Sequence, residues 1–234
     1  MRGVRRQNRR RLQNQGFTLN EQTLSRRLER VAAHVPQGAR LADIGSDHGY
    51  LPVALMLRGV LEAAVAGEVA QTPFASAQRN VRRNGLQAQV TVRLADGLAA
   101  VEPQDRISVV SICGMGGDTM CEILEAGKQR LGGVTRLVLQ PNGGERELRQ
   151  WLAGNGYQIV SEELLRENRF DYEIIVAEPG RGVYSAEQLY FGPVLMQEKS
   201  EAFVVKWRRM LRQKQQTLAC LLYTSPSPRD RQKS

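Results

Sequence analysis

The turn after the first predicted strand of this chain combines acidic residues with glycines. In residues 41–52, LADIGSDHGYLP, the acids Asp43 and Asp47 alternate with Gly45 and Gly49. The glycines allow a tight turn and a close approach of a ligand to the backbone, and the carboxylates favour a cationic ligand. A dinucleotide pyrophosphate would instead require a GxGxxG pattern at this place. The turn therefore predicts a site for a ligand that carries positive charge. The residues assigned to it are Asp43, Gly45, Ser46, Asp47, His48 and Gly49.

The next three predicted strands also end in groups that suit a nucleoside. Glu68, 25 residues after Asp43, could accept hydrogen bonds from both ribose hydroxyls, and Asp96 could accept one from an adenine amino group. Residues 113–117, CGMGG, offer bare backbone to a large ligand. Ligands of open α/β sheets bind beyond the carboxyl ends of the strands, so four such ends in succession predict an S-adenosyl-L-methionine site. The further residues assigned to it are Glu68, Val69, Asp96, Gly97, Gly114, Met115, Gly116 and Gly117.

Each member of this set also has a simpler structural interpretation. Asp43 and Asp47 could be turn or helix-cap residues, and residues 96–97 could form a plain turn. His48 could donate to a turn carbonyl, and Cys113, without an evident basic partner, is more typical of a small buried hydrophobe than of a nucleophile. The ordered set, rather than any one residue, carries the prediction.

The fifth predicted strand ends in Gln140, Pro141 and Asn142, whose polar groups could contact the hydrogen-bonding edge of a base. A structural turn is the alternative for this stretch. The loop after the fourth strand lacks the Asn/Asp-Pro-Pro-Tyr/Phe motif that clamps an exocyclic amine. Its absence disfavours methylation of an amino group and leaves a ring nitrogen as the better acceptor.

Strand-like and helix-like segments alternate through the centre of the chain. The predicted strands are residues 40–44, 64–68, 90–94, 107–112 and 135–140, with helices near residues 24–35, 51–57, 73–84, 119–126 and 145–153. Residues 157–164 and 172–177 are joined by a short polar link, so they should pair as a hairpin. We therefore expect an α/β fold with a Rossmann-like class I methyltransferase sheet, in which five parallel strands precede an antiparallel C-terminal hairpin. A C-terminal helical extension should follow the hairpin.

Charge is distributed unevenly along the chain, whose net charge is +9. Residues 1–30 hold nine arginines and two glutamates, and residues 205–234 hold eight lysines or arginines and one aspartate, so basic ends flank an acidic centre. Basic segments bind polyanions, which suggests nucleic acid. The alternative is that these charges lie on solvated helix faces and in a flexible tail without a binding role. The expected divisions are a basic, disordered extension (1–19), a SAM-dependent methyltransferase domain (20–180) and a helical, coiled-coil-like extension (181–219).

Composition narrows the setting of the protein. No apolar run reaches the roughly 18–20 residues of a membrane span, and three cysteines without ligand spacing plus two histidines make no metal site. We expect a cytoplasmic monomer without a metal or a membrane contact. Residues 220–234 stand apart, because CLLYTSPSPRD is also the translation of a common transposase sequencing adaptor. We suspect an adaptor-derived artefact there and a natural C-terminus that is missing.

The motifs SRRLERVAAHVPQGARLADIGSDHGYLP, GEV, ADGL, GMGG, EILEAG and LVLQPN lie within residues 24–218. Together they resemble the bacterial tRNA (adenine-N1)-methyltransferase family. The resemblance implies methylation of adenine 22 in the D-arm region of tRNA, with the C-terminal helices helping to hold the tRNA. Arg27 matches a family arginine that could meet the cofactor carboxylate or a tRNA phosphate. The residues expected to grip phosphates are Lys206, Arg208, Arg209, Arg212 and Lys214.

The implied chemistry is an in-line displacement in which the adenine N1 lone pair attacks a sulfonium methyl group. N1 is already a nucleophile, so the enzyme mainly aligns donor and acceptor. Asp43 or Asp47 is the candidate catalytic residue, because a carboxylate could accept from N6 and stabilise the developing positive charge. N1 lies on the Watson–Crick edge, so the base must be unpaired or flipped out. The alternatives are a SAM-dependent methyltransferase of another RNA base or a small molecule, and a non-catalytic RNA-binding protein with a degenerate nucleotide pocket.

Overall fold

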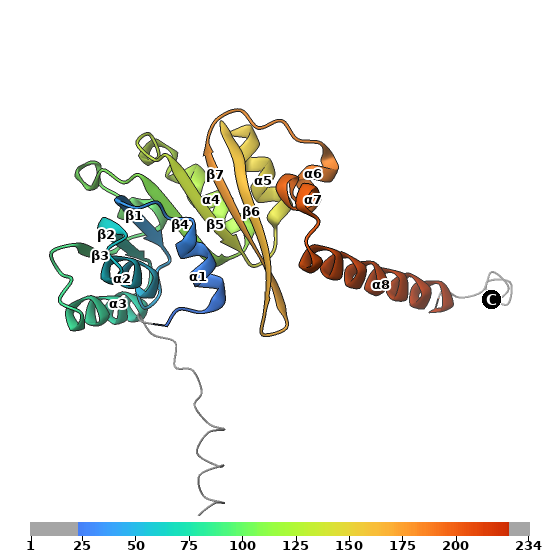
Figure 1. Cartoon of the computed structure of the whole chain (residues 1–234), viewed down its shortest axis with the longest axis horizontal. Coiled ribbons are helices and arrows are strands. Elements are labelled where there is room, and N and C mark those ends of the chain that lie inside the picture. Colours follow the sequence, from blue (N-terminus) through green and yellow to red (C-terminus); the bar gives the residue numbers. More distant parts are fainter. Residues whose placement is uncertain (1–22, 225–234) are drawn as a thin grey trace, which may run out of the picture.

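The computed structural model describes residues 23–224. The predicted basic extension of residues 1–19 and residues 225–234 of the suspected tail lie outside the described residues. The described chain is built on one seven-stranded mixed sheet, with the strand order β3-β2-β1-β4-β5-β7-β6 (Figure 1). Its strands are β1 (Ala39–Ile44), β2 (Leu61–Glu68), β3 (Val90–Leu94), β4 (Val109–Met115), β5 (Arg136–Pro141), β6 (Tyr157–Glu167) and β7 (Phe170–Pro179).

The predicted sheet is confirmed. Strands β1 to β5 pair in parallel, and β7 pairs antiparallel with both β5 and β6. The strand order reverses direction between β1 and β4, which is the place where open α/β sheets leave a crevice for ligands. The carboxyl ends of β1, β2, β3 and β4 therefore meet at one edge of the sheet.

Helices cover both faces of the sheet and then leave it. The helices are α1 (Arg26–Ala33), α2 (Tyr50–Leu57), α3 (Gln71–Arg83), α4 (Gly117–Ala126), α5 (Glu145–Gly154), α6 (Ala186–Phe191), α7 (Pro193–Glu198) and α8 (Glu201–Thr224), with short 3-10 turns at Gly97–Ala100, Pro103–Asp105 and Lys128–Arg130. Helix α1 begins where the Ser25 hydroxyl accepts from the Leu28 amide at 3.2 Å. Among the residues that the structure describes, no helix is long and apolar enough to cross a bilayer.

Two hydrophobic cores lie on opposite faces of the sheet. Successive strand residues point to opposite faces, so Leu41 and Val138 pack with α1, α2 and α3, while their neighbours Ala42 and Leu139 pack with α4 and α5. The strands of a sheet covered on both faces need apolar residues at nearly every position. This requirement explains the continuous apolar runs of the central strands and holds their polar ends at the ligand edge.

Within the described residues, the C-terminal extension forms three helices, α6, α7 and α8. Helices α6 and α7 lie beside α5 and β6, and α8 projects away from the body of the molecule (Figure 1). Helix α8 runs without interruption through Cys220, the first residue of the suspected artefact, to Thr224.

Candidate functional site

Two adjoining cavities open at the carboxyl ends of the strands. The first, about 560 Å³, is lined by residues that include Val69, Asp96 and Gly97. The second, about 450 Å³, is lined by Arg27, Leu28, Asp43, Gly45, Ser46, Asp47, Tyr50, Leu51, Glu68, Pro73, Cys113, Gly114, Met115 and Asn142. Gly45 and Met115 line both cavities. The two spaces therefore adjoin at these residues and together could accommodate one elongated ligand.

Gly45 is required where the two cavities adjoin. Its φ of +70° lies in the left-handed region, and a Cβ there would overlap the Cε atom of Met115. Met115 thus packs directly over bare backbone at the end of β1. A glycine is therefore required at position 45 both by its backbone conformation and by the close approach of Met115 in the cavity wall.

Asp43 is a fixed, buried carboxylate at the end of β1. Its side chain accepts from Ser46 Oγ and from Ser111 Oγ, each at 2.6 Å, and the residue is 4% exposed. Burial raises the pKa of Asp43, while the two serine hydroxyls and the nearby Arg27 guanidinium oppose that rise. The arrangement holds an acidic group rigidly beside the space that a ligand would fill.

Glu68 and Asp47 add two further acids to the same cavity. A Glu68 carboxylate oxygen accepts from the Asp47 backbone amide, and Asp47 has a left-handed φ of +56°. Burial raises the pKa of Glu68, the amide of Asp47 opposes that rise, and the charges of Asp47 and Asp43 raise the pKa further. Three carboxylates around one space favour a ligand that carries positive charge.

Arg27 is the one cation among the described residues that line this cavity. Its guanidinium donates to Gln140 Oε1 and lies 5.4 Å from the centroid of the Tyr172 ring. The helix that carries it, α1, is held by the β6–β7 hairpin, since Glu167 accepts from the Arg26 amide at 2.9 Å and from the Arg27 amide at 3.3 Å. The hairpin therefore positions Arg27 for an anionic group of a ligand.

A second contact of the hairpin with α1 involves Glu163. Its carboxylate lies 2.6 Å from Arg30 Nε and 2.8 Å from His34 Nε2. Burial alone would raise the pKa of Glu163, but the hydrogen bonds from His34 and Arg30 outweigh burial and lower the pKa to about 2. Sequence reasoning missed Glu163 and Glu167, because their role depends on strand register rather than on a local motif.

Several predicted cofactor residues lie outside the two cavity walls. His48 is exposed and stacks on Tyr50 with ring centroids 5.1 Å apart, and Gly49 packs against Ala77. Gly117 has a structural role, because a Cβ there would overlap the backbone carbonyl of Gly144. The residues that the structure does bring to the walls are Arg27, Asp43, Gly45, Ser46, Asp47, Glu68, Val69, Asp96, Gly97, Gly114 and Met115, whereas His48, Gly49, Gly116 and Gly117 are not among the lining residues.

The predicted base-contacting residues separate into a buried pair and an exposed member. Gln140 is 0% exposed and Pro141 is also buried, so neither side chain is accessible to a base. The Gln140 amide instead contacts Arg27, the Pro141 carbonyl and Asn142. Asn142 is exposed and lines the second cavity. Gln140 thus has an internal role in place of the predicted contact with a base.

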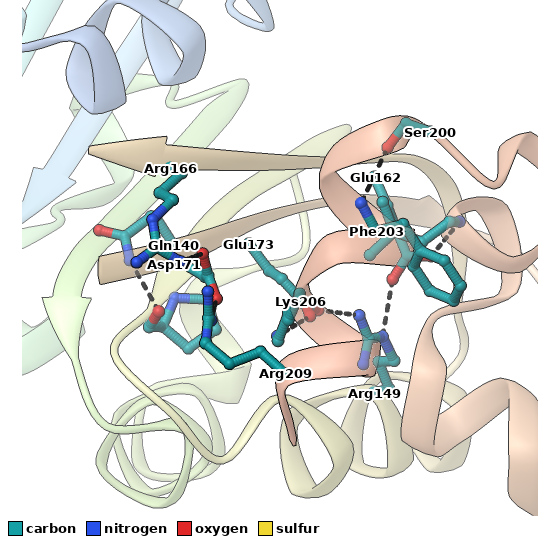
Figure 2. Close-up of polar contacts among 12 residues, drawn as sticks. Gln140, Arg149, Glu162, Arg166, Asp171, Glu173, Ser200, Phe203, Lys206 and Arg209 are labelled. Carbon is teal, nitrogen blue, oxygen red and sulfur yellow. Dashed lines mark hydrogen bonds and ion pairs between the residues drawn. The ribbon is translucent and has the colours of Figure 1, made fainter. Parts of the chain in front are cut away.

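A buried ion-pair network fixes the C-terminal extension to the sheet (Figure 2). Arg149 on α5 pairs with Glu162 at 2.6 Å and with Glu173, and Lys206 on α8 lies 2.5 Å from the other oxygen of Glu173. Glu162 also accepts from the Val194 amide of α7 at 2.8 Å. Removing one member would leave an uncompensated buried charge, so the network holds α5, the hairpin, α7 and α8 together.

The basic residues of α8 fall into two groups. Lys206 pairs with Glu173, and Arg209 pairs with Asp171, so both are engaged by the hairpin rather than extended toward solvent (Figure 2). Arg208, Arg212 and Lys214 are exposed, and Lys214 Nζ lies 3.3 Å from the Tyr190 hydroxyl. The exposed group therefore presents the more accessible positive charge.

The wall of the second cavity also contains a thiol, Cys113. Within residues 23–224, no group of three or more histidine, cysteine, aspartate or glutamate side chains is arranged to hold a metal ion. Burial raises the pKa of the Cys113 thiol, and the charge of Asp43 raises it further. Such a thiol is a poor nucleophile, and Cys113 is partly buried and packs against the hydrophobic core.

Comparison with known proteins gives the family. The model of the tRNA (adenine(22)-N(1))-methyltransferase family matches residues 41–232. The chain is 38% identical over 221 residues to the tRNA (adenine(22)-N(1))-methyltransferase of Bacillus subtilis, covering 92% of both chains.

Solved structures agree with that match. The Streptococcus pneumoniae protein Sp1610, solved in complex with S-adenosyl-L-methionine, is 49% identical with a TM-score of 0.79 and covers 81% of this chain and 88% of its own. Mycoplasma capricolum TrmK, solved with S-adenosyl-homocysteine, is 27% identical with a TM-score of 0.76 and covers 88% of this chain and 91% of its own.

The parallel sheet, its antiparallel hairpin and the acidic cavity at the switch point define a class I, S-adenosyl-L-methionine-dependent methyltransferase. Within that class, the chain belongs to the tRNA (adenine(22)-N(1))-methyltransferase family.

Proposed function

We propose that this chain transfers a methyl group from S-adenosyl-L-methionine to N1 of adenine 22 in tRNA, the reaction that its family's name describes. The observation that carries the proposal is the second cavity, where Asp43, Asp47 and Glu68 surround a space that also contains Arg27. Three acids suit a ligand with a sulfonium and an ammonium, and the arginine suits the carboxylate of the same ligand.

The residues of both cavities fit the cofactor in parts. Glu68 would accept from the ribose hydroxyls, and Asp96 in the adjoining cavity would accept from the adenine amino group. Asp43 would hold the ammonium group and Arg27 the carboxylate. When bound, S-adenosyl-L-methionine supplies a methyl group on a positively charged sulfur. The chain's task is then to orient the donor and acceptor and to exclude water.

The two candidate catalytic acids differ in their surroundings. Asp43 is buried and fixed by two serines, which suits a residue that holds the cofactor. Asp47 is exposed in the cavity wall and would place negative charge near a base that becomes positively charged during transfer. No proton needs to leave N1 before the attack, so the target base must mainly be unpaired and aligned.

The tRNA would be held by the extension that follows the sheet. Arg208, Arg212 and Lys214 are exposed on α8 and would contact phosphates, which positions an RNA without identifying its sequence. The buried network around Arg149 would keep α8 at a fixed place relative to the cavity. We further propose a cytoplasmic monomer. Cys113 and Cys121 form no disulfide, which fits a reducing compartment.

The proposal is tested by incubating the protein with S-adenosyl-L-methionine and unmodified tRNA, followed by nucleoside mass spectrometry and mapping of the modified position. We expect N1-methyladenosine at position 22 of the tRNA, as the family name states. Another methylated nucleoside would favour the alternative of a different RNA base. Binding of tRNA without methyl transfer, despite cofactor binding, would favour a non-catalytic RNA-binding protein.

A further inference from the structure

The end of β5 carries an ordered chain of side-chain amides that connects Arg27 with the end of β4. Arg27 Nη1 donates to Gln140 Oε1, and Gln140 Nε2 donates to the Pro141 carbonyl at 2.7 Å and to Asn142 Oδ1 at 3.2 Å. Asn142 Nδ2 then donates to the Gly114 carbonyl at 2.8 Å. The direction of every amide in this chain is set by its neighbours.

Gln140 cannot be turned around without loss. A guanidinium has donors only, so it requires the oxygen of the Gln140 amide, and the carbonyl of Pro141 requires the nitrogen. The side chain is 0% exposed, so no water can replace a lost partner at low cost. Gln140 therefore determines that Asn142 turns its oxygen, rather than its nitrogen, toward Gln140.

Asn142 is both fixed and accessible. Its backbone amide donates to the Met115 carbonyl at 2.7 Å, its side chain is tied to Gly114, and yet the residue is exposed in the wall of the second cavity. A side-chain amide has two lone pairs and two N–H groups. After its contacts with Gln140 and Gly114, one lone pair on Oδ1 and one N–H on Nδ2 are left for a ligand.

We propose that Asn142 is the residue that recognises the acceptor adenine, through a hydrogen bond from the adenine N6 amino group to Asn142 Oδ1, and that Gln140 is the positioning residue that fixes this orientation. The inference rests on the proposed function. Adenine presents an N6 donor beside the unprotonated N1, whereas guanine presents a carbonyl oxygen beside a protonated N1. The remaining lone pair on Asn142 Oδ1 can accept from the N6 amino group of adenine, whereas the guanine carbonyl at the same place offers it no donor.

The contact also gains strength during the reaction. Methylation of N1 places positive charge on the ring and on N6, so the N6–H bond becomes a better donor to Oδ1 in the transition state than in the ground state. Asp47 is a less suitable acceptor for this purpose, because its exposed carboxylate lies 3.6 Å from His48 Nε2 and lacks comparable fixed contacts. A fixed group costs little reorganisation during transfer.

The test is a double-mutant cycle in which one change is made in the enzyme and the other in the substrate. Wild type and Asn142→Ala are each assayed on two tRNAs, one with adenine and one with unsubstituted purine at the target position. Loss of a charge-assisted hydrogen bond should lower the wild-type rate on purine about 10- to 100-fold beyond the intrinsic loss of N1 nucleophilicity. The intrinsic loss is common to both enzymes and cancels in the cycle.

We expect Asn142→Ala to be slower on adenine by a similar factor and to lose the extra penalty on purine. Asn142→Asp retains an oxygen acceptor and should retain that penalty. Gln140→Glu keeps an acceptor for Arg27 but removes the donor to Asn142, so the purine penalty should shrink. Calorimetry of cofactor binding measures separately any effect of the new carboxylate on Arg27. These variants separate a change in recognition from a failure to fold.

If the rate loss caused by purine is the same in wild type and in Asn142→Ala, the two changes act independently and the inference is overturned, even when wild type methylates adenine normally. If wild type transfers no methyl group to the adenine-containing tRNA, the proposed function itself fails and the inference falls with it. Retention of the full purine penalty in Gln140→Glu would overturn the positioning role of Gln140 alone.

Discussion

Replacing Glu68 by glutamine should change stability and cofactor affinity in opposite directions. Three carboxylates face one cavity, and burial together with the charges of Asp47 and Asp43 opposes ionisation of Glu68. The amide of glutamine still offers an oxygen to the Asp47 backbone amide. Glu68→Gln therefore removes an unfavourable buried charge without removing its internal hydrogen bond. Relief of this kind is worth about 1 kcal/mol, or a rise of roughly 2–4 °C in the melting temperature.

The same change should weaken the cofactor complex. A carboxylate can accept from both ribose hydroxyls, whereas glutamine has one acceptor oxygen and no charge. Loss of one charge-assisted bond and weakening of the other cost about 2–3 kcal/mol, or roughly 30- to 150-fold in Kd. Isothermal titration calorimetry with S-adenosyl-L-methionine measures the affinity, and thermal unfolding of the free protein measures the stability.

The matched control is Glu62→Gln, which lies on the same strand and is 65% exposed at its side chain, 2.9 Å from Arg40. It should alter neither quantity appreciably. The stability gain of Glu68→Gln should also fade as the pH falls from the raised pKa of Glu68 toward the ordinary value of 4.5, below which Glu68 is protonated in both folded and unfolded states. A lower melting temperature with an unchanged Kd would refute the assignment of Glu68 to the ribose.

Three further outcomes follow from contacts elsewhere in the fold. Arg149→Met should lower the free energy of unfolding by about 3–5 kcal/mol in urea titrations, because it leaves buried Glu162 without a cationic partner and Glu173 with Lys206 alone; a loss below 1 kcal/mol would contradict the network. Glu163 should contribute about 3 kcal/mol that is present above pH 4.5 and lost as the pH falls toward 2, so Glu163→Gln should flatten the stability profile over that interval; an unchanged profile would count against the pairing. Gly117→Ala should lower the free energy of unfolding by about 1–3 kcal/mol, because its Cβ would overlap the Gly144 carbonyl, whereas a Cβ at Gly116 meets open space and Gly116→Ala should cost much less. Thermal unfolding of the two variants measures both losses, and equal losses would argue against the overlap.

The positions of the strands could be predicted from local patterns because each buried strand is an apolar run that ends at turn residues. The strand predicted at residues 90–94 matches β3, and those predicted at 40–44 and 64–68 end where β1 and β2 end. Strand β4 extends beyond its predicted end at Ile112 because an irregular pairing carries it to Met115 against β5. Local sequence does not encode that irregularity.

The acidic side of the site was predictable for a related reason. Parallel strands bring their carboxyl ends to one edge, so Asp43 and Glu68 had to lie close together once the sheet was recognised. Gln140 was assigned to the wrong kind of environment, because a polar residue at a strand end is usually accessible and this one is covered by Arg27 and Asn142. Only the packed structure distinguishes its role from that of Asn142.

The partners of α8 could not be derived from sequence at all. Lys206 is separated from Glu173 by 33 residues, and their contact depends on the hairpin register and on the direction in which α7 leads into α8. A basic helix predicts a nucleic-acid contact whether or not its charges are already paired. In the structure, Lys206 and Arg209 are paired with acids of the hairpin, whereas Arg208, Arg212 and Lys214 are exposed.

The most direct test of the account is methyl transfer to two unmodified tRNA transcripts that differ at one nucleotide. One carries adenine at position 22, the position in the family's name, and the other carries guanine there. With labelled S-adenosyl-L-methionine, we expect label in the first transcript alone, recovered by mass spectrometry as N1-methyladenosine at that position. Equal labelling of both transcripts, or a different methylated nucleoside in the first, would contradict it.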